Sequence, residues 1–359
     1  MTFARPLLIS LGLLFVLLST SLSCGPDFDP YWKVDRLRIL GIQADPVIAR
    51  PMEPTTLRAE VWAPDDPIDY QWSWCPLRLS AQDEYRCPID ADDFAQWIDE
   101  DDFDDDPFDL GDESEATFTN PFEPDEVQAF CEAIQAAILD AAGDQALAEF
   151  LPGGDCSDGY EVSIRLAVST DSKELVAAKR FRLWAGGDEP NENPSIEGIQ
   201  FRPDDPDDAQ RLAEDFDWPI DPDAPHDEHW VDSDLDTPLS VPPDLALEWR
   251  TLIDPDSVLT YTPPTPRGSD EPPEPRQESY VYRHFTTLGD IGSSRHLFSP
   301  QQNTLEEASK TDFDVDPDSL DDCLEPIDGG CSIKLWTVVR DSRLGQSWAA
   351  TSLELREDS

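Results

Sequence analysis

Short segments in which apolar and polar side chains alternate, bounded by Asp and Pro, most limit the folds open to this chain. In the first half they cover residues 34–42 (VDRLRILGI), 56–62 (TLRAEVW), 70–74 (YQWSW), 160–168 and 174–184. Such alternation buries one face of a strand, as in antiparallel sheets, whereas strands of a parallel sheet are apolar on both faces. We therefore predict a mainly β protein built of antiparallel β-sandwiches.

The second half carries segments of the same kind, and its candidate strands are residues 195–201, 239–241, 245–252, 280–287, 332–340 and 347–357. A stretch rich in Gly, Asn, Asp and Pro (AGGDEPNENP) separates the halves. Both halves open with one alternating strand and close with two long ones, which suggests two copies of one sandwich. We expect a first domain over residues 34–185, a linker over 186–194 and a second domain over 195–359.

Insertions interrupt both expected domains. In the first, residues 76–158 hold an Asp-rich run at 90–109 and then a predicted helix near 124–142. Its apolar residues recur at helical spacing, and they are Val127, Phe130, Ile134, Ile138 and Ala141. In the second domain, residues 202–237 are acidic and Pro-rich and residues 261–278 are Pro-rich. We expect the insertions of the second domain to be mobile or extended loops.

The N-terminus resembles a bacterial lipoprotein signal peptide over residues 1–23. Arg5 precedes an apolar run of about twelve residues, which is below the roughly 20 needed to span a bilayer. The resemblance implies lipidation of Cys24 and a short tether over residues 24–33. Ser21 and Leu22 stand in the reverse of the usual lipobox order, so ordinary cleavage or a structural role for this cysteine are the alternatives.

The other cysteines form an even set, and they are Cys75, Cys87, Cys131, Cys156, Cys323 and Cys331. In an exported chain such a set predicts disulfides. Spacing favours Cys323 with Cys331. For the rest it leaves open Cys75 with Cys87 and Cys131 with Cys156, or else Cys75 with Cys156. No CxxC pair occurs, and no histidine lies near a cysteine in sequence, so we do not expect a catalytic thiol.

Charge excludes one class of partner. The chain has 78 acidic and 25 basic residues, a net charge of −53, and its cations are scattered. Nucleic-acid binding needs clustered Lys and Arg and is therefore not expected. An anionic membrane surface would also repel the chain, so lipid would have to hold it there. The acidity fits adaptation to a saline habitat, and the alternatives are solvated acidic loops or cation binding.

Candidate sites are few. The sharpest is residues 314–325 (DVDPDSLDDCLE), where carboxylates fall at positions 1, 3, 5, 9 and 12 of an EF-hand-like calcium loop, namely Asp314, Asp316, Asp318, Asp322 and Glu325. Ser319 replaces the glycine that such loops need at position six. His226 and His229, among further carboxylates, are a second possible metal pair. Calcium is thus the one cofactor under consideration.

Catalytic motifs are not found. The chain contains no GxSxG, HExxH, P-loop or GxGxxG sequence, so we predict no catalytic residue and no enzyme. The remaining histidines, His284 and His296, are expected on sheet surfaces. Among the eleven tryptophans, those in acidic loops are the best candidates for partner contacts, and they are Trp97, Trp218 and Trp230.

Several framework segments resemble uncharacterised lipoproteins of myxobacteria and related deltaproteobacterial predators. They are residues 34–47 (VDRLRILGIQADPV), 191–196 (NENPSI), 278–289 (ESYVYRHFTTLG) and 335–348 (LWTVVRDSRLGQSW). The resemblance covers the anchor and both frameworks, but not the acidic insertions. It implies two immunoglobulin-like β-sandwich domains behind a lipid anchor and supplies no active site.

We accordingly predict a non-catalytic lipoprotein of the bacterial cell envelope, at the outer membrane. Its expected role is that of a structural or protein-interaction and adhesion module. Its expected partners are the membrane, through the lipid, and an unknown envelope or extracellular protein. The alternative is a calcium- or glycan-binding surface module that uses the acidic loops.

Overall fold

The computed structural model describes residues 30–64, 67–77, 79–81, 84–89, 94, 106–142, 156, 159–186, 191–263 and 274–356. The expected signal peptide, Cys24 and most of the Asp-rich run lie outside the described residues. None of the helices in the described part of the chain is long and apolar enough to cross a membrane.

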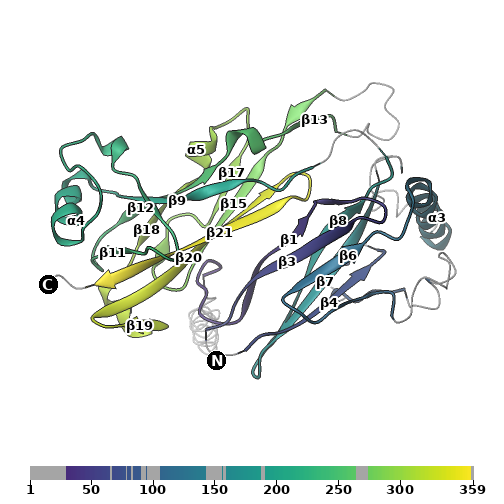
Figure 1. Ribbon diagram of the computed structural model, residues 1–359, viewed down its shortest axis with the longest axis horizontal. Coiled ribbons are helices and arrows are strands. Elements are labelled where there is room, and N and C mark those ends of the chain that lie inside the picture. The colour runs from purple at the N-terminus through teal and green to yellow at the C-terminus, as the bar shows by residue number, and fades with distance from the viewer. Residues whose placement is uncertain are drawn as a thin grey trace, which may run out of the picture.

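The first half folds into two sheets (Figure 1). One has the strand order β1-β3-β6 and the other β2-β8-β7-β4-β5. Neighbours are antiparallel except β2 and β8, which are parallel. The strands are β1 (Arg38–Asp45), β2 (Ile48–Ala49), β3 (Pro54–Trp62), β4 (Asp69–Cys75), β5 (Asp109–Gly111), β6 (Glu115–Thr119), β7 (Tyr160–Ser169) and β8 (Glu174–Leu183).

The second half also contains two main sheets, with the orders β10-β9-β12-β18-β16 and β11-β21-β20-β15-β17. A short ribbon, β13-β14, lies beside the Pro-rich insertion, and β19 pairs with β20. The strands are β9 (Ile196–Pro203), β10 (Val231–Ser233), β11 (Leu239–Val241), β12 (Leu247–Ile253), β13 (Thr260–Tyr261), β14 (Arg276–Gln277), β15 (Tyr280–Thr286), β16 (Asp290–Ile291), β17 (Arg295–Phe298), β18 (Lys310–Asp314), β19 (Glu325–Ile327), β20 (Gly330–Asp341) and β21 (Gln346–Arg356).

The two halves share one strand order. The series β1-β3-β6 corresponds to β9-β12-β18, and β2-β8-β7-β4-β5 corresponds to β11-β21-β20-β15-β17. In both, a short early strand, β2 or β11, pairs in parallel with the last strand. This arrangement, with strands A, B and E in one sheet and G, F, C and C′ in the other, is immunoglobulin-like. The predicted fold class, mainly β with sandwiches of this type, is confirmed.

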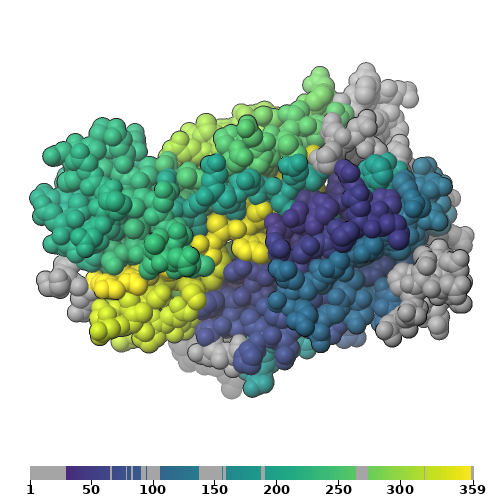
Figure 2. Space-filling view, in the orientation of Figure 1, coloured from purple at the N-terminus to yellow at the C-terminus, as the bar shows by residue number. Residues whose placement is uncertain are grey.

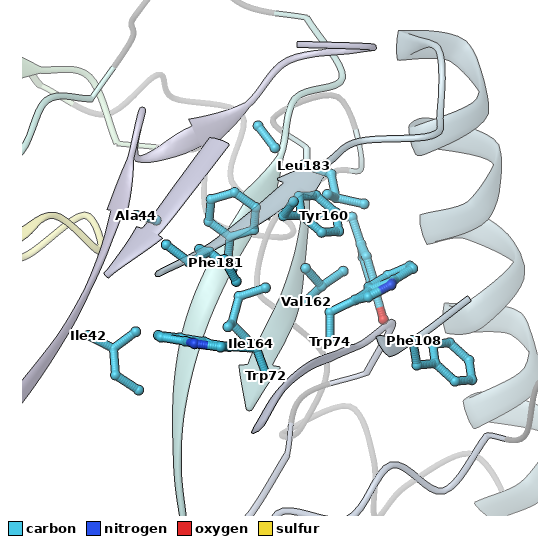
Figure 3. Close-up of a cluster of buried hydrophobic side chains, with 14 of the residues drawn as sticks. Ile42, Ala44, Trp72, Trp74, Phe108, Tyr160, Val162, Ile164, Phe181 and Leu183 are labelled. Atoms are coloured by element: carbon cyan, nitrogen blue, oxygen red, sulfur yellow. The ribbon is translucent and has the colours of Figure 1, made fainter. Parts of the chain in front are cut away.

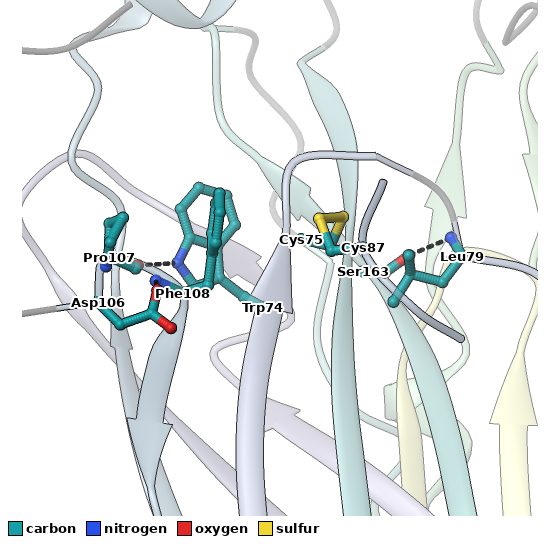
Figure 4. The surroundings of a disulfide bond; sticks show 8 residues. All are labelled: Trp74, Cys75, Leu79, Cys87, Asp106, Pro107, Phe108 and Ser163. Carbon is teal, nitrogen blue, oxygen red and sulfur yellow. Dashed lines mark hydrogen bonds between the residues drawn. A yellow bond between two sulfur atoms is a disulfide. The ribbon is translucent and has the colours of Figure 1, made fainter. Parts of the chain in front are cut away.

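Each half has its own core. In the first, Trp72 and Trp74 on β4 point inward between the sheets (Figure 3). The ring of Trp74 lies edge-on to Phe94 and Phe118, each at 5.3 Å between centroids. Its indole N–H donates a hydrogen bond to the carbonyl oxygen of Pro107 at 2.7 Å (Figure 4). Alternation in β4 therefore buries both large rings, and their polar atoms are satisfied by a neighbouring segment.

Helix α3 (Pro124–Ala142) confirms the predicted helix and lies beside the first sandwich (Figure 1). Its described apolar stripe, Val127, Phe130 and Ile134, is buried in the first core. The side chains of Ile138 and Ala141 lie outside the described part. Two acidic residues in the first turn complement the helix dipole.

Three disulfides occur among the described residues. Of the arrangements left open by spacing, the structure has Cys75 with Cys87 (Figure 4), Cys131 with Cys156, and Cys323 with Cys331. The second joins α3 to the segment before β7. Disulfides persist in oxidising compartments, so these bonds indicate an extracytoplasmic protein.

The acidic insertion at residues 202–237 differs from the expected loop. It contains α4 (Ala209–Asp215), and Leu212 and Trp218 from this segment are buried in the second core. The indole N–H of Trp218 donates to the carbonyl oxygen of Ser240 at 2.7 Å. A few large apolar residues therefore outweigh the acidic composition and fix this insertion. The insertion at 261–278 has β13 and β14 at its described ends, and its middle lies outside the described residues.

Candidate functional site at the junction of the two sandwiches

The two sandwiches meet through the outer faces of two sheets. The β1-β3 sheet packs against the sheet containing β15 and β20, and Figure 2 shows the purple surface of the first strands against the yellow surface of the C-terminal hairpin. The junction core consists of Val34, Leu40, Trp62, Phe285, Trp336 and Val338. Because β20 is covered by its own core on one face and by the first sandwich on the other, all residues from 335 to 339 are buried.

A tryptophan and glutamate cluster lies at the centre of this junction. The rings of Trp62 and Trp336 are edge to face, with centroids 5.3 Å apart. Trp336 Nε1 donates to Glu60 Oε1 at 2.8 Å, and Lys334 Nζ lies 4.5 Å from the centroid of the Trp62 ring. Burial raises the pKa of Glu60, and hydrogen bonds from the Trp336 and Trp348 side chains oppose that rise. The cluster thus joins the sandwiches by packing and by directed hydrogen bonds.

The segment before β1 also binds the second sandwich. The N–H of Val34 donates to the carbonyl oxygen of Thr286 at 2.8 Å, and the N–H of Thr286 donates to that of Trp32 at 3.0 Å. The Tyr31 ring lies 5.7 Å from that of Phe285. The described end of the expected tether is therefore held between the two sandwiches, in the region that we call the waist.

The turn between β20 and β21 is held by the segment that links the halves. Asn191 Nδ2 donates to Asp341 Oδ2 at 3.1 Å. Asn193 Nδ2 donates to the carbonyl oxygen of Ala44 at 2.9 Å, and Asn193 Oδ1 accepts from the N–H of Gln346 at 2.9 Å. Asn193 thus bonds to both sandwiches at once, which fixes the described part of the linker.

A buried carboxyl group lies beside this turn. Glu278 Oε1 accepts from Arg343 Nη1 at 3.1 Å, while Glu278 Oε2 is buried without a hydrogen-bond partner in the described part. Burial, and next the charge of Asp341, raise the pKa of Glu278 to about 7 against the opposing effect of Arg343. Burial also raises the pKa of Asp341. The buried carboxyl group of Glu278 therefore lies close to a guanidinium and is also affected by the charge of a second carboxyl group.

This arrangement predicts a pH effect on stability. Because the folded state raises the pKa of Glu278 from 4.5 to about 7, it binds this proton more tightly than the unfolded chain, and stability falls as pH rises from about 4.5 to 7. We expect Glu278→Gln to stabilise the protein at pH 8, to leave it nearly unchanged at pH 4 and to reduce the fall between them. Urea unfolding at several pH values measures this, with the exposed Glu174→Gln as control. A variant with the wild-type pH dependence would contradict the assignment.

The predicted calcium-loop residues take separate roles. Asp314 ends β18, Asp316 Oδ1 accepts from the N–H of Asp318 at 2.9 Å, and Glu325 Oε1 accepts from Lys334 Nζ at 2.8 Å. Asp322 lies 3.8 Å from Lys33 Nζ. Within the described residues, no three carboxylates of this loop come within 4.8 Å of one another. Calcium binding at this loop stays a prediction.

A different group of carboxylates does come together. Oxygens of Asp204, Glu248 and Asp312 lie within 4.8 Å of one another. Glu248 Oε2 already accepts from Arg202 Nε, and Asp204 and Asp312 are exposed. The group lies on β12, β18 and the residue after β9, so it arises from strand pairing and has no local signature in the sequence.

Three of the histidines can be placed within the second half of the chain. The rings of His226 and His229 have centroids 5.7 Å apart, and a ring nitrogen of His226 lies 2.8 Å from the carbonyl oxygen of Pro203. No carboxylate of the described residues completes a three-ligand group with this pair. The prediction that His284 lies on a sheet surface is wrong. It is fully buried beside Thr337, and burial lowers its pKa to about 3, so it is neutral.

Of the tryptophans predicted to contact a partner, Trp218 is buried in the second core and Trp97 lies outside the described part. Trp230 is half-buried and carries a cluster of cations over its ring. Arg250 lies 4.1 Å, Arg202 4.7 Å and Lys310 5.6 Å from the ring centroid. The three cations come from β9, β12 and β18 and form ion pairs with Asp227, Glu248 and Glu306, so the sheet assembles a cluster of ion pairs around an aromatic ring that no sequence segment shows.

No protein-family model and no curated protein matches the chain. Three solved structures show distant similarity at 8% identity. Escherichia coli alpha-2-macroglobulin activated by porcine elastase has a TM-score of 0.20, over 92% of this chain and 23% of that one. Murine CEACAM1b has 0.17, over 89% and 100%. Dimeric latent PorU from Porphyromonas gingivalis has 0.18, over 90% and 24%.

The chain thus spans about a quarter of the length of two of these proteins. Similarity at this level says nothing about function, and the fold assignment rests on the strand order.

Proposed function

We propose that this protein is a non-catalytic lipoprotein of the bacterial outer membrane, anchored through Cys24, which holds two rigidly joined sandwiches close to the membrane as a structural or protein-interaction module. The observation that carries this proposal is the attachment of the segment before β1 at the waist, through Val34 and Thr286. A lipid-anchored tether would therefore join the folded part at its middle, so both sandwiches would lie close to the membrane.

The length of the tether sets this distance. Trp32 is eight positions after Cys24, and an extended chain spans at most about 3.6 Å per residue, so the waist would lie within roughly 30 Å of the lipid. The junction between the sandwiches supports the same role, because a fixed angle between two domains presents their outer loops in a constant arrangement. The partner we propose is an envelope or extracellular protein that contacts these loops.

Cys24→Ala tests the anchor. We expect the wild-type protein, expressed in a bacterium that processes lipoproteins, to incorporate labelled palmitate and to enter the detergent phase on phase separation. The variant should do neither. Ser23→Ala is the matched control, because it changes the neighbouring residue and keeps a small side chain beside the cysteine. A Cys24→Ala protein that still enters the detergent phase would contradict the anchor.

Protease treatment of intact cells then tests on which side of the outer membrane the protein lies. Digestion in whole cells would indicate display on the cell surface, and digestion only after the outer membrane is opened would indicate a periplasmic face. In either case, crosslinking from exposed loops to a neighbouring protein is the expected sign of an interaction module. If membrane fractionation places the wild-type protein with the inner membrane, the proposed location is contradicted.

A further inference from the structure

A cavity of about 300 Å³ lies at the junction, between β1 and β8 of the first sandwich and the β20-β21 turn of the second. Both sandwiches contribute to its wall, so it exists only in the joined molecule. Three of its lining residues are cations, and they are Lys179, Arg180 and Arg340. In a chain with a net charge of −53, this concentration of positive charge needs an explanation.

Lys179 is the buried member of this group. Its residue is 9% exposed, and its Nζ donates to the carbonyl oxygen of Leu344 at 2.6 Å. Within the described part of the chain, no carboxylate lies within 4.0 Å of this ammonium. Burial, and next the charge of Arg340, lower the pKa of Lys179 to about 8, and the charge of Asp341 opposes that shift. The buried ammonium is therefore close to other cations and donates its described hydrogen bond to a neutral oxygen.

Asp341 does not form an ion pair with the Lys179 ammonium, although it also lines the cavity. Its Oδ1 accepts from the N–H groups of Arg343 and Gly345, each at 2.7 Å, and its Oδ2 accepts from Asn191 Nδ2. These bonds hold its carboxylate to its own turn and to the linker. Arg180 lies 3.6 Å from Glu161, whereas Arg340 has no ion pair among the described residues.

Gln346 forms part of the wall of the same cavity. Gln346 is 4% exposed, and its Nε2 is buried without a hydrogen-bond partner in the described part. It lies against Gly41, where an added Cβ would come within 2.2 Å of this nitrogen. Because this nitrogen is covered by Gly41 and does not face the open space, Gln346 shapes the cavity wall and leaves Lys179 and Arg340 as the groups that can contact an anion.

We propose that this cavity binds a small oxyanion, a carboxylate or a phosphate, which accepts a hydrogen bond from Lys179 Nζ and balances the charge of Arg340. Oxyanions suit such a site because several acceptor oxygens can take bonds from an ammonium and a guanidinium together. Since both sandwiches supply the donors, the bound anion stabilises their junction. This proposal does not depend on the lipid anchor or on the proposed function.

The test is thermal unfolding of the whole mature chain at pH 7, in sodium phosphate, sodium succinate or sodium chloride at equal ionic strength. A ligand bound only by the folded state raises the midpoint. We expect phosphate or succinate to raise the midpoint of the wild-type protein above its value in chloride. Lys179→Met should lose this anion-dependent rise, and the exposed Arg340→Gln should reduce it. Lys173→Met is the matched control, because it removes a lysine from the tip of the same hairpin and should keep the full rise.

Each comparison is made within one variant, with and without the anion, so a change in the basal stability of Lys179→Met does not affect the result. Calorimetric titration with the effective anion should show at least a roughly tenfold weaker dissociation constant for Lys179→Met. A response to phosphate alone, or to succinate alone, identifies the oxyanion class. Equal midpoints in all three salts, or an undiminished rise in Lys179→Met, would overturn the proposal.

Discussion

Replacing Trp336 by alanine is expected to lower the free energy of unfolding by about 3–5 kcal/mol, the usual cost of removing a buried tryptophan side chain. Trp336 is 2% exposed and packs against Trp62 across the junction. The change opens a cavity there and also takes a hydrogen-bond donor from the buried carboxyl of Glu60. Because each sandwich keeps its own core, we further expect thermal unfolding to separate into two transitions.

Trp336→Phe separates the two contributions. It keeps a ring beside Trp62 and removes the Trp336 indole N–H from Glu60, which keeps its hydrogen bond from the Trp348 side chain, so we expect a smaller loss, of about 1–3 kcal/mol. Calorimetry on the wild-type protein and both variants measures the transitions. A single transition at the wild-type midpoint in Trp336→Ala would show that the junction does not couple the sandwiches.

Replacing Cys131 and Cys156 together by serine should also have a large effect. This disulfide closes a loop with a sequence separation of 25 and fastens α3 to the segment before β7. Chain-entropy estimates for a loop of that length give a loss of about 3.5 kcal/mol. We expect α3, with Phe130 buried in the first core, to become more accessible to proteases in the double variant.

Cys323 and Cys331, replaced in the same way, are the matched control. Their disulfide has a sequence separation of 8, for which the same estimate gives about 2.5 kcal/mol, and it lies in the second sandwich. Denaturant unfolding should therefore rank the two double variants in this order, and only the first should change proteolysis near α3. The reverse order, or cleavage near α3 in both variants, would contradict this account.

Much of the framework could be predicted from the sequence because one face of each long strand is buried. The alternation of residues 56–62 and 70–74 predicts β3 and β4, and that of residues 332–340 and 347–357 predicts β20 and β21. Short strands such as β5 and β16 carry too few residues for a period to show, and they are defined by their neighbours in the sheet.

The junction could not be predicted from alternation alone, because it depends on burial of the outer faces of two sheets. Its one signal is the run LWTVV at residues 335–339, which is apolar on both faces where an exposed sheet would alternate. The error over His284 has the same kind of cause. Its polar ring is tolerated in the core because a ring nitrogen hydrogen-bonds with the Thr337 hydroxyl. This contact joins two neighbouring strands, so no pattern in the local sequence predicts it.

The pairing of the N-terminal segment with β15 also sets the order in which the chain can complete its fold. Chains emerge N-terminus first, and domains tend to fold as units as they appear. The N–H of Val34 meets its acceptor, the carbonyl oxygen of Thr286, only after about 250 further residues have been made. During that interval the first sandwich exposes Trp62 and the apolar face around it, so a nascent chain is vulnerable to wrong partners until its own second half arrives to cover it.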